Sequence, residues 1–433
     1  MLRVVAIAVL IAGCGGKKDE PAPVVELPPA DAAPPPPPPK APPSELTGAP
    51  VCDPEHTPSF EGVAQISGGV AHACARKRDG TVVCWGENGA GMLGAGTPDP
   101  VNHPTQVCNL TQVVEVAVTS YHTCARKVDG TVWCWGANTA GQLGDGTTTD
   151  RDTPVRASGV ARAVAIAVGG FESCAVEEDG GVACWGVGRT AAKKVPGLAN
   201  AAQVAIGSGV LCVLARGGTV ACRGTGPEGA PPAPEVVLGL DGARSISHRW
   251  SRGCATRADG TVACWQGAGE GGTAPVTGLA NAAHVTTGLG HACALAGGGA
   301  VACWGDNAKG QLGDRAVERS AAPRVVPGVT GAELVGAGHD FTCAKLRAGG
   351  IRCWGNQPPN LVPDPPPPPP RPVLCPRAEI PVYDKPGCGA DATFRCVKSF
   401  RPCSQQYCGC SGKTVGGCAG TALAPFKQKG HCL

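Results

Sequence analysis

The chain has 433 residues, a formal net charge of +3 and only 16% charged residues. This length suits two or three domains, and so weak a charge argues against a nucleic-acid or acidic-membrane partner. The 25 cysteines predict an oxidising compartment, because cytosolic thiols are kept reduced.

The N-terminus predicts export. A short basic start (Met1 to Arg3) precedes an apolar run and then Ile11-Ala-Gly-Cys14. This resembles the bacterial lipoprotein signal, in which the cysteine is diacylated and becomes the first mature residue. An ordinary small-residue cleavage site or a chance apolar start is the alternative. The run is too short to span a bilayer. We expect a signal peptide over 1–13 and a lipid on Cys14, at the outer membrane or cell surface, with the periplasm also open.

Residues 14–50 form a proline-rich tether, with an unbroken proline run over 34–39. A polyproline II segment rises about 3.1 Å per residue and acts as a stiff spacer. We expect this tether to hold the body of the protein away from the membrane.

Seven copies of one hairpin follow, and in each copy two cysteines lie ten positions apart. In the second copy, the loop Val128-Asp129-Gly130 fits a type I turn followed by a glycine with positive φ. That register places Cys124 directly opposite Cys134 and predicts a cross-strand disulfide. The predicted pairs are Cys74–Cys84, Cys124–Cys134, Cys174–Cys184, Cys212–Cys222, Cys254–Cys264, Cys293–Cys303 and Cys343–Cys353.

The repeats predict an all-β fold, a seven-bladed β-propeller over 51–362. Each unit has an apolar run such as 113–118, then the two hairpin strands, and the fuller units add an extended piece such as 154–156. Four short strands every 40 to 50 residues are typical of a propeller blade. The last unit is truncated, so we expect an N-terminal strand near Pro50-Val-Cys52 to complete blade seven.

The segment from Cys134 to Thr147, CWGANTAGQLGDGT, resembles the regulator of chromosome condensation repeat, and 311–314 and 92–94 repeat its core. The resemblance covers about residues 60–360 and implies a seven-bladed propeller. The founder of that family acts on a nuclear GTPase. A disulfide-bonded lipoprotein would not meet that partner, so we do not expect exchange activity here.

A second proline-rich linker over 363–374 leads to a cysteine-rich module over 375–433. Its eight cysteines predict four disulfides of unknown connectivity. Residues 408–414 faintly resemble part of a Kazal-type inhibitor, whereas a plain disulfide-held module is the simpler interpretation. Parity then suggests that Cys52 pairs with Cys108.

Two recurring side chains are candidate functional residues. A tryptophan follows the second cysteine in six copies, with Arg223 in the fourth, and this regularity favours packing between blades over sugar stacking. His72, His122 and His291 lie two residues before a first cysteine, so they could share a metal at one rim. A structural histidine bonded to the backbone is the simpler interpretation. We expect no metal and no cofactor.

Long segments occur in blades one, two and six, with Gly-Gln-Leu-Gly in blades two and six and Gly-Met-Leu-Gly in blade one, and a closed ring would bring these blades near one another through blade seven. We expect this sector to face a ligand. Its candidate residues are Asn88, Asn138, Gln142, Asp145, Asn307, Gln311 and Asp314.

The sequence shows no nucleophile with a base at recognisable spacing and no phosphate loop, so we do not expect an enzyme. The predicted function is a monomeric, membrane-anchored binding scaffold for an unknown protein or glycan, with no nucleic-acid partner. A protease or hydrolase inhibitor is the alternative. The sequence supports two other functions less: a glycosidase, which would need clustered carboxylates, and guanine-nucleotide exchange.

Overall fold

The computed structural model divides the chain into two units, Met1–Val362 and Pro363–Leu433. It describes residues 58–356 apart from 225–234, 238 and 270–271, together with Pro358 and five short strands beyond residue 378. The predicted signal peptide, the lipidation at Cys14, both proline-rich segments and the predicted strand at Pro50–Cys52 lie outside the described residues.

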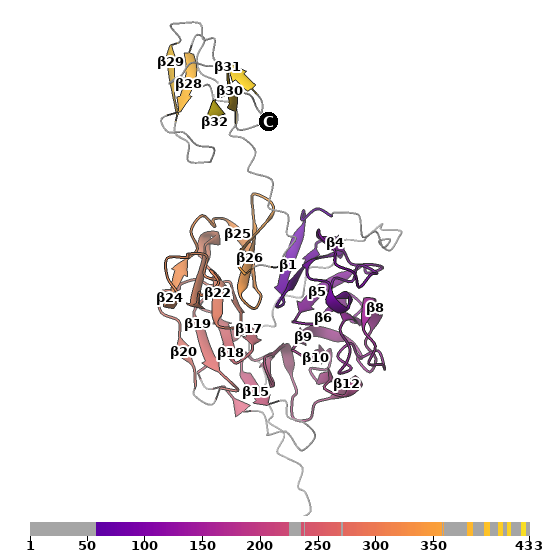
Figure 1. Cartoon of the computed structure of the whole chain (residues 1–433). Helices are drawn as coiled ribbons and strands as arrows, with labels where there is room; N and C mark the ends of the chain where they lie inside the picture. Colours follow the sequence, from indigo (N-terminus) through magenta and orange to yellow (C-terminus); the bar gives the residue numbers. More distant parts are fainter. Residues whose placement is uncertain are drawn as a thin grey trace, which may run out of the picture. The chain divides into compact units, whose positions relative to one another are not determined.

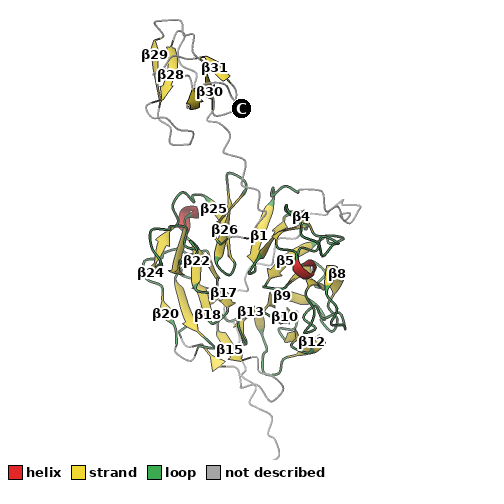
Figure 2. Cartoon of the chain, in the orientation of Figure 1, coloured by secondary structure: helices red, strands yellow, loops and turns green. Residues whose placement is uncertain are grey.

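The first unit is a ring of seven antiparallel sheets, each built from strands consecutive in sequence (Figures 1 and 2). These sheets are the blades, and they are numbered in chain order. Blades 1 and 2 contain β1 (Val63–Gly68), β2 (His72–Lys77), β3 (Val82–Gly86), β4 (Thr105–Gln106), β5 (Val113–Val118), β6 (His122–Lys127), β7 (Val132–Gly136) and β8 (Arg151–Arg156). Blades 3 and 4 contain β9 (Ala163–Val168), β10 (Glu172–Glu177), β11 (Val182–Gly186), β12 (Arg189–Lys194), β13 (Ala201–Ile206), β14 (Val210–Ala215), β15 (Val220–Gly224) and β16 (Glu235–Val236).

Blades 5 and 6 contain β17 (Ala243–Arg249), β18 (Arg252–Arg257), β19 (Val262–Gln266), β20 (Ala274–Pro275), β21 (His284–Thr287), β22 (His291–Leu295), β23 (Val301–Asp306) and β24 (Arg319–Val325). Blade 7 contains β25 (Ala332–Ala337), β26 (Phe341–Leu346) and β27 (Ile351–Gly355). Two short 3-10 turns, η1 (Gly89–Gly91) and η2 (Gly297–Gly299), complete the regular elements of this unit's described part.

The repeated hairpin has the register predicted from its cysteine spacing. In blade 2 the Lys127 N–H donates to the Thr131 carbonyl (2.9 Å), and Gly130 has a φ of 80°. Cys124 lies opposite Cys134. All seven predicted cross-strand disulfides are present, with Cα–Cα distances of 4.0 to 4.1 Å. Each disulfide therefore links the second and third strands of one blade.

The aspartates of the hairpin turns bond their own loops. Asp129 Oδ1 accepts from the Thr131 backbone N–H (2.9 Å) and from the Thr131 hydroxyl (2.7 Å). Equivalent backbone bonds occur at Asp79, Asp179 and Asp259. Burial alone would raise the pKa of Asp129, but the bonds from Thr131 outweigh it and the pKa is lowered. These carboxylates fix the turns.

The core consists of seven similar clusters, one at each junction between neighbouring blades. The disulfide of one blade packs in the same cluster as the tryptophan of the next, because residues adjacent along a strand point to opposite faces. Trp85, Trp135 and Trp185 are fully buried. In blade 4 Arg223 replaces the tryptophan, and its guanidinium donates to the Pro196 carbonyl of blade 3 (2.9 Å). The tryptophans are core residues, as predicted.

The ring closes between blade 7 and blade 1. Figure 1 shows β25 and β26, in orange, beside β1, in indigo. Phe341 and Cys343 share a core cluster with Val63, Ile66 and Trp85. The His339 N–H also donates to the Gly69 carbonyl (2.8 Å). The first strands of the blades contact one another around the whole ring and line its centre.

The second unit contains β28 (Glu379–Tyr383), β29 (Phe394–Lys398), β30 (Gln406–Gly409), β31 (Thr414–Gly416) and β32 (Phe426–Lys429). β28 and β29 pair, and β30 lies between β31 and β32. The predicted disulfides of this module lie outside what the structure describes. Cys108 is disulfide-bonded, whereas its predicted partner Cys52 lies outside the described residues.

Candidate functional site: the loop face of the propeller

One face of the propeller carries two sets of connections. In blade 1, His72 at the start of β2 pairs with Gly86 at the end of β3. The turn between β1 and β2 therefore lies at the same end of the blade as the connection between β3 and β4. The corresponding pairing recurs in the other blades, for example between His122 and Gly136. We call this end of the ring the loop face; the Asp-Gly hairpin turns lie at the opposite end.

An exposed aromatic pair lies on the loop face of blades 2 and 3. Tyr121 and Phe171 occupy corresponding turns, and their rings stack with centroids 5.3 Å apart and an interplanar angle of 15°. They are 47% and 50% exposed. Val187 is exposed beside them, and its backbone N–H donates to the Phe171 carbonyl (3.0 Å). We call Tyr121, Phe171 and Val187 the aromatic patch.

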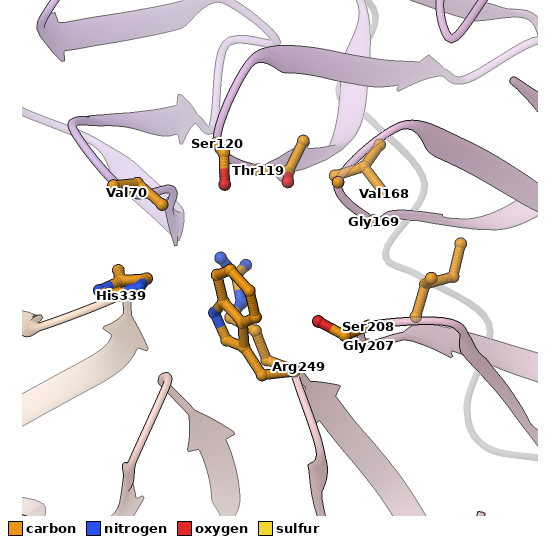
Figure 3. A pocket seen from close by; sticks show the side chains of 12 residues that line it. Val70, Thr119, Ser120, Val168, Gly169, Gly207, Ser208, Arg249 and His339 are labelled. Carbon is orange, nitrogen blue, oxygen red and sulfur yellow. The ribbon is translucent and has the colours of Figure 1, made fainter. Parts of the chain in front are cut away.

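The centre of the loop face holds a small cavity at the mouth of the channel (Figure 3). Its volume is about 50 Å³, which is room for a few water molecules. Turn residues of several blades line it, among them Val70, Ser120, Gly169 and Ser208, with His339 on one side. Figure 3 shows Arg249 pointing into the space between these turns.

Arg249 links opposite sides of the channel. It ends β17 in blade 5, and its guanidinium donates to the Gly68 carbonyl of blade 1 (2.6 Å) and to the Val118 carbonyl of blade 2 (3.0 Å). Burial lowers the pKa of Arg249 to about 10, so the side chain keeps its charge at neutral pH. This arginine spans the mouth of the channel and adds a positive charge to the centre of the loop face.

Trp250 and His339 sit next to Arg249. Their rings meet edge to face with centroids 5.3 Å apart, and His339 Nδ1 lies 2.8 Å from Asp340 Oδ2. Trp250 has a φ of 54°, a left-handed conformation that a bulky residue rarely adopts. Its carbonyl accepts from the Ser208 N–H of blade 4 (2.9 Å), which holds the turn in place.

The three repeated histidines join neighbouring blades. His72 Nε2 bonds the Thr123 hydroxyl (2.9 Å), His122 bonds Ser173 (2.8 Å), and His291 bonds Thr342 (2.9 Å). The predicted structural role is therefore present, but the backbone partner was wrong: each imidazole uses a hydroxyl of the next blade. Burial lowers the pKa of His72 and His122 to about 3 and that of His291 to about 4.

Each hydroxyl continues the connection to a long loop. Ser173 Oγ donates to the Gln142 carbonyl (2.9 Å), and Thr123 and Thr342 donate to the Met92 and Gln311 carbonyls (3.4 and 3.3 Å). The histidine and the long segment therefore occur together in blades 1, 2 and 6, because the histidine helps to hold the segment through this hydroxyl. Both features are visible in the sequence, but the relation between them was not predicted. The Thr or Ser that directly precedes the first cysteine of the following blade could have indicated this relation.

The predicted ligand-facing residues are mostly internal. Asn88, Asn138, Gln142, Asn307 and Gln311 are at most 4% exposed. Asn138 Oδ1 accepts from the Leu143 N–H (2.9 Å), while its amide donates to carbonyls of the same loop; Asn88 and Asn307 do likewise. Gln142 accepts from the Ala140 N–H (2.8 Å). These five side chains shape the long loops from within and present no surface to a ligand in this structure.

Asp145 and Asp314 are the two predicted residues that reach the surface. Asp145 pairs with Arg151 (2.7 Å) and accepts from Thr147, and Asp314 pairs with Arg324 (2.7 Å). Both aspartates are thus engaged within their own loops. A ligand could contact them only beside these ion pairs.

Within the described residues, one group has the closeness that metal binding needs: Glu172, Cys174 and Cys184. The two cysteines form a disulfide, which removes their thiolates, and Glu172 pairs with Arg189 (2.6 Å). His72, His122 and His291 do not belong to such a group. The described residues contain no helix with the length and apolar character needed to cross a bilayer.

Comparison with known proteins agrees with this architecture. Models of the Regulator of chromosome condensation (RCC1) repeat match residues 79–126, 129–176 and 298–344, and a second RCC1 repeat model matches 63–91, 113–142 and 282–311. The molecule is therefore a seven-bladed β-propeller, and parts of it match the RCC1 repeat. A comparison with curated proteins found no matching sequence.

Solved structures share the fold at low identity. Human WBSCR16 is 18% identical with a TM-score of 0.58, covering 67% of this chain and 89% of that one. A chain in the complex of Kap60 with yeast RCC1 (Prp20) is 18% identical with a TM-score of 0.55, covering 68% and 80%. Prp20p from Saccharomyces cerevisiae is 19% identical with a TM-score of 0.53, covering 68% and 83%. These likenesses show the fold alone.

Proposed function

We propose that this protein is an extracytoplasmic binding scaffold that captures a partner protein on its loop face, through the aromatic patch. The observation that carries the proposal is the exposed stack of Tyr121 on Phe171. Exposed aromatic side chains dominate the binding energy of many protein interfaces. The seven disulfides support an oxidising location, which suits a rigid scaffold outside the cytosol.

The surroundings of the aromatic patch favour a protein over a glycan. Val70 and Leu289, on turns of blades 1 and 6, are also exposed apolar residues of the loop face. Aliphatic side chains of this kind suit apolar side chains of a partner better than sugar hydroxyls. Two rings stacked on each other also leave fewer free faces for sugar stacking. Exposed apolar side chains on one face are a surface that a protein can cover.

We further propose that the scaffold is tethered to the cell envelope by a lipid on Cys14. The support is the resemblance of residues 1–14 to a lipoprotein signal, together with the proline-rich segment that follows. The tether would keep the propeller at the membrane while leaving its loop face free. We propose a role in binding without catalysis, and we do not extend the partners of the RCC1 relatives to this chain.

The test places a photo-cross-linking amino acid at position 121 in the producing cell. A matched control carries it at Val128, which is 52% exposed on the hairpin turn of the same blade at the opposite end. The proposal predicts a discrete protein adduct from position 121 and none of that mass from 128. Phe171→Ser, placed in the 121 background, should reduce the adduct. No adduct from 121, or equal adducts from both positions, would contradict the proposal.

A further inference from the structure

A second pocket lies between blades 5 and 6 and is larger than the channel cavity, with a volume of about 400 Å³. Trp304 lines it, with Arg252 and Gln266 from blade 5. Apolar side chains of Pro275, Val276 and Ala321 complete much of the wall. Pockets of this size and mixed lining are typical of sites for small molecules.

The pocket is open because blade 5 lacks the long segment. In blade 1 that segment places the Met92 carbonyl on the indole N–H of Trp135 (2.9 Å), and in blade 6 the Gln311 carbonyl accepts from Trp354 (3.0 Å). A buried leucine of each segment, Leu93 or Leu312, fills the space at the junction. The corresponding Trp304 forms no hydrogen bond with any residue that the structure describes, and Trp185, which follows the long segment of blade 2, has an unbonded indole N–H as well. No carbonyl of a long segment therefore accepts a hydrogen bond from the indole N–H of Trp304.

Arg252 supplies the charge of this pocket. It begins β18 and is half-buried, and its side chain makes neither a hydrogen bond nor an ion pair with the described residues. Burial lowers its pKa, and the nearby charge of Arg319 lowers it further. Two arginines close enough to repel each other, without an acidic partner in the described part of the chain, favour an added anion.

We propose that this pocket binds a uronic acid, either as the free sugar acid or as a unit of an acidic polysaccharide. The carboxylate pairs with the Arg252 guanidinium, which presents planar donors suited to carboxylates. The sugar ring lies against the apolar wall near Trp304, and the Gln266 amide and Thr277 hydroxyl face its hydroxyl groups. The pocket lies in blades 5 and 6, so the proposal does not depend on the aromatic patch of blades 2 and 3.

Isothermal titration calorimetry of the exported protein at low salt tests this proposal, with glucuronate, glucose and a trimer of galacturonate as probes. We expect saturable binding of glucuronate, with glucose at least about tenfold weaker, because glucose lacks the carboxylate that pairs with Arg252. A trimer that binds more tightly than the monomer indicates a polysaccharide source. Equal affinity of trimer and monomer indicates the free sugar acid.

Two variants and a control locate the site. Arg252→Gln should weaken glucuronate binding at least about tenfold, and Ala321→Trp, at an exposed wall position, should block the pocket without changing the core. Arg162→Gln, which removes an exposed arginine of another blade, should bind normally. Equal binding of glucuronate and glucose, no binding at about 10 mM, or unchanged binding in Arg252→Gln would overturn the proposal.

Discussion

The buried histidines between the blades should make the propeller sensitive to mild acid. His122 is fully buried, and its pKa is lowered to about 3, whereas an unfolded histidine titrates near 6.5. The unfolded chain therefore binds more protons than the folded chain below pH 6.5, and stability falls as the pH falls. At pH 5 the unfolded imidazole lies about 1.5 pH units below its pKa, so this one residue costs about 2 kcal/mol relative to neutral pH.

Replacing His122 with asparagine removes that proton-binding site. The variant should be less stable than the wild type at pH 7, because the bond to Ser173 and the packing of the imidazole are altered. Its further loss between pH 7 and pH 5 should be about 2 kcal/mol smaller than that of the wild type. Urea unfolding at both pH values, followed by near-ultraviolet circular dichroism with the disulfides intact, measures this difference.

The neighbouring variant Tyr121→Phe serves as the control, because it changes an exposed side chain and should keep the wild-type pH dependence. The turn aspartates do not obscure the result, since a lowered pKa such as that of Asp129 places their titration at more acidic pH. If His122→Asn loses as much stability between pH 7 and pH 5 as the wild type does, the inference that the His122 imidazole is neutral in the folded protein is wrong.

Three further perturbations test the ring. Arg249→Ala removes the donor to the Gly68 and Val118 carbonyls and should lower the free energy of unfolding in urea by about 2–4 kcal/mol. The exposed control Arg162→Ala should change it by less than about 0.5 kcal/mol. Equal effects of the two variants would refute the link across the channel. Gly69→Ala would place a Cβ against the Thr119 carbonyl and should sharply reduce the yield of soluble protein. Gly170→Ala has open space around its Cβ and should be tolerated. Two equally soluble variants would contradict this packing. Replacing Cys124 and Cys134 together with alanine should lower stability by at most about 3 kcal/mol, and an unchanged unfolding midpoint would show that this disulfide adds nothing.

The sequence was most informative where the interactions are local. The cysteine spacing and the Asp-Gly loop determine the hairpin register, because a shift of one residue would move Cys124 and Cys134 to opposite faces. The same alternation puts Trp135 on the face opposite the disulfide, which predicts its packing between blades. The repeat number then determines a ring of seven blades.

The sequence was less informative about contacts between blades. The hydroxyl partner of His122 lies 51 residues away, so only the three-dimensional ring shows it. Asn138 looks like a ligand-binding side chain in the sequence, yet its amide holds its own loop. The bond from its Oδ1 to Leu143, five residues further on, recurs at Asn88 and Asn307 and could have indicated this role.

The sequence contained only a weak indication of the aromatic patch. Tyr121 and Phe171 each lie three positions before the first cysteine of their blades, so a common position in the ring could have been inferred. Their exposure could not, because most aromatic residues of such a repeat are buried. Arg249 was unpredictable in physical terms, since its partners belong to blades on the other side of the channel.

The most direct test of this account is a disulfide map of the native protein, purified without reductant and with free thiols blocked at lysis. The account predicts seven linked peptide pairs, one for each blade from Cys74–Cys84 to Cys343–Cys353, with no blocked thiol at any of these positions. Free thiols at these fourteen positions, or links between cysteines of different blades, would contradict it.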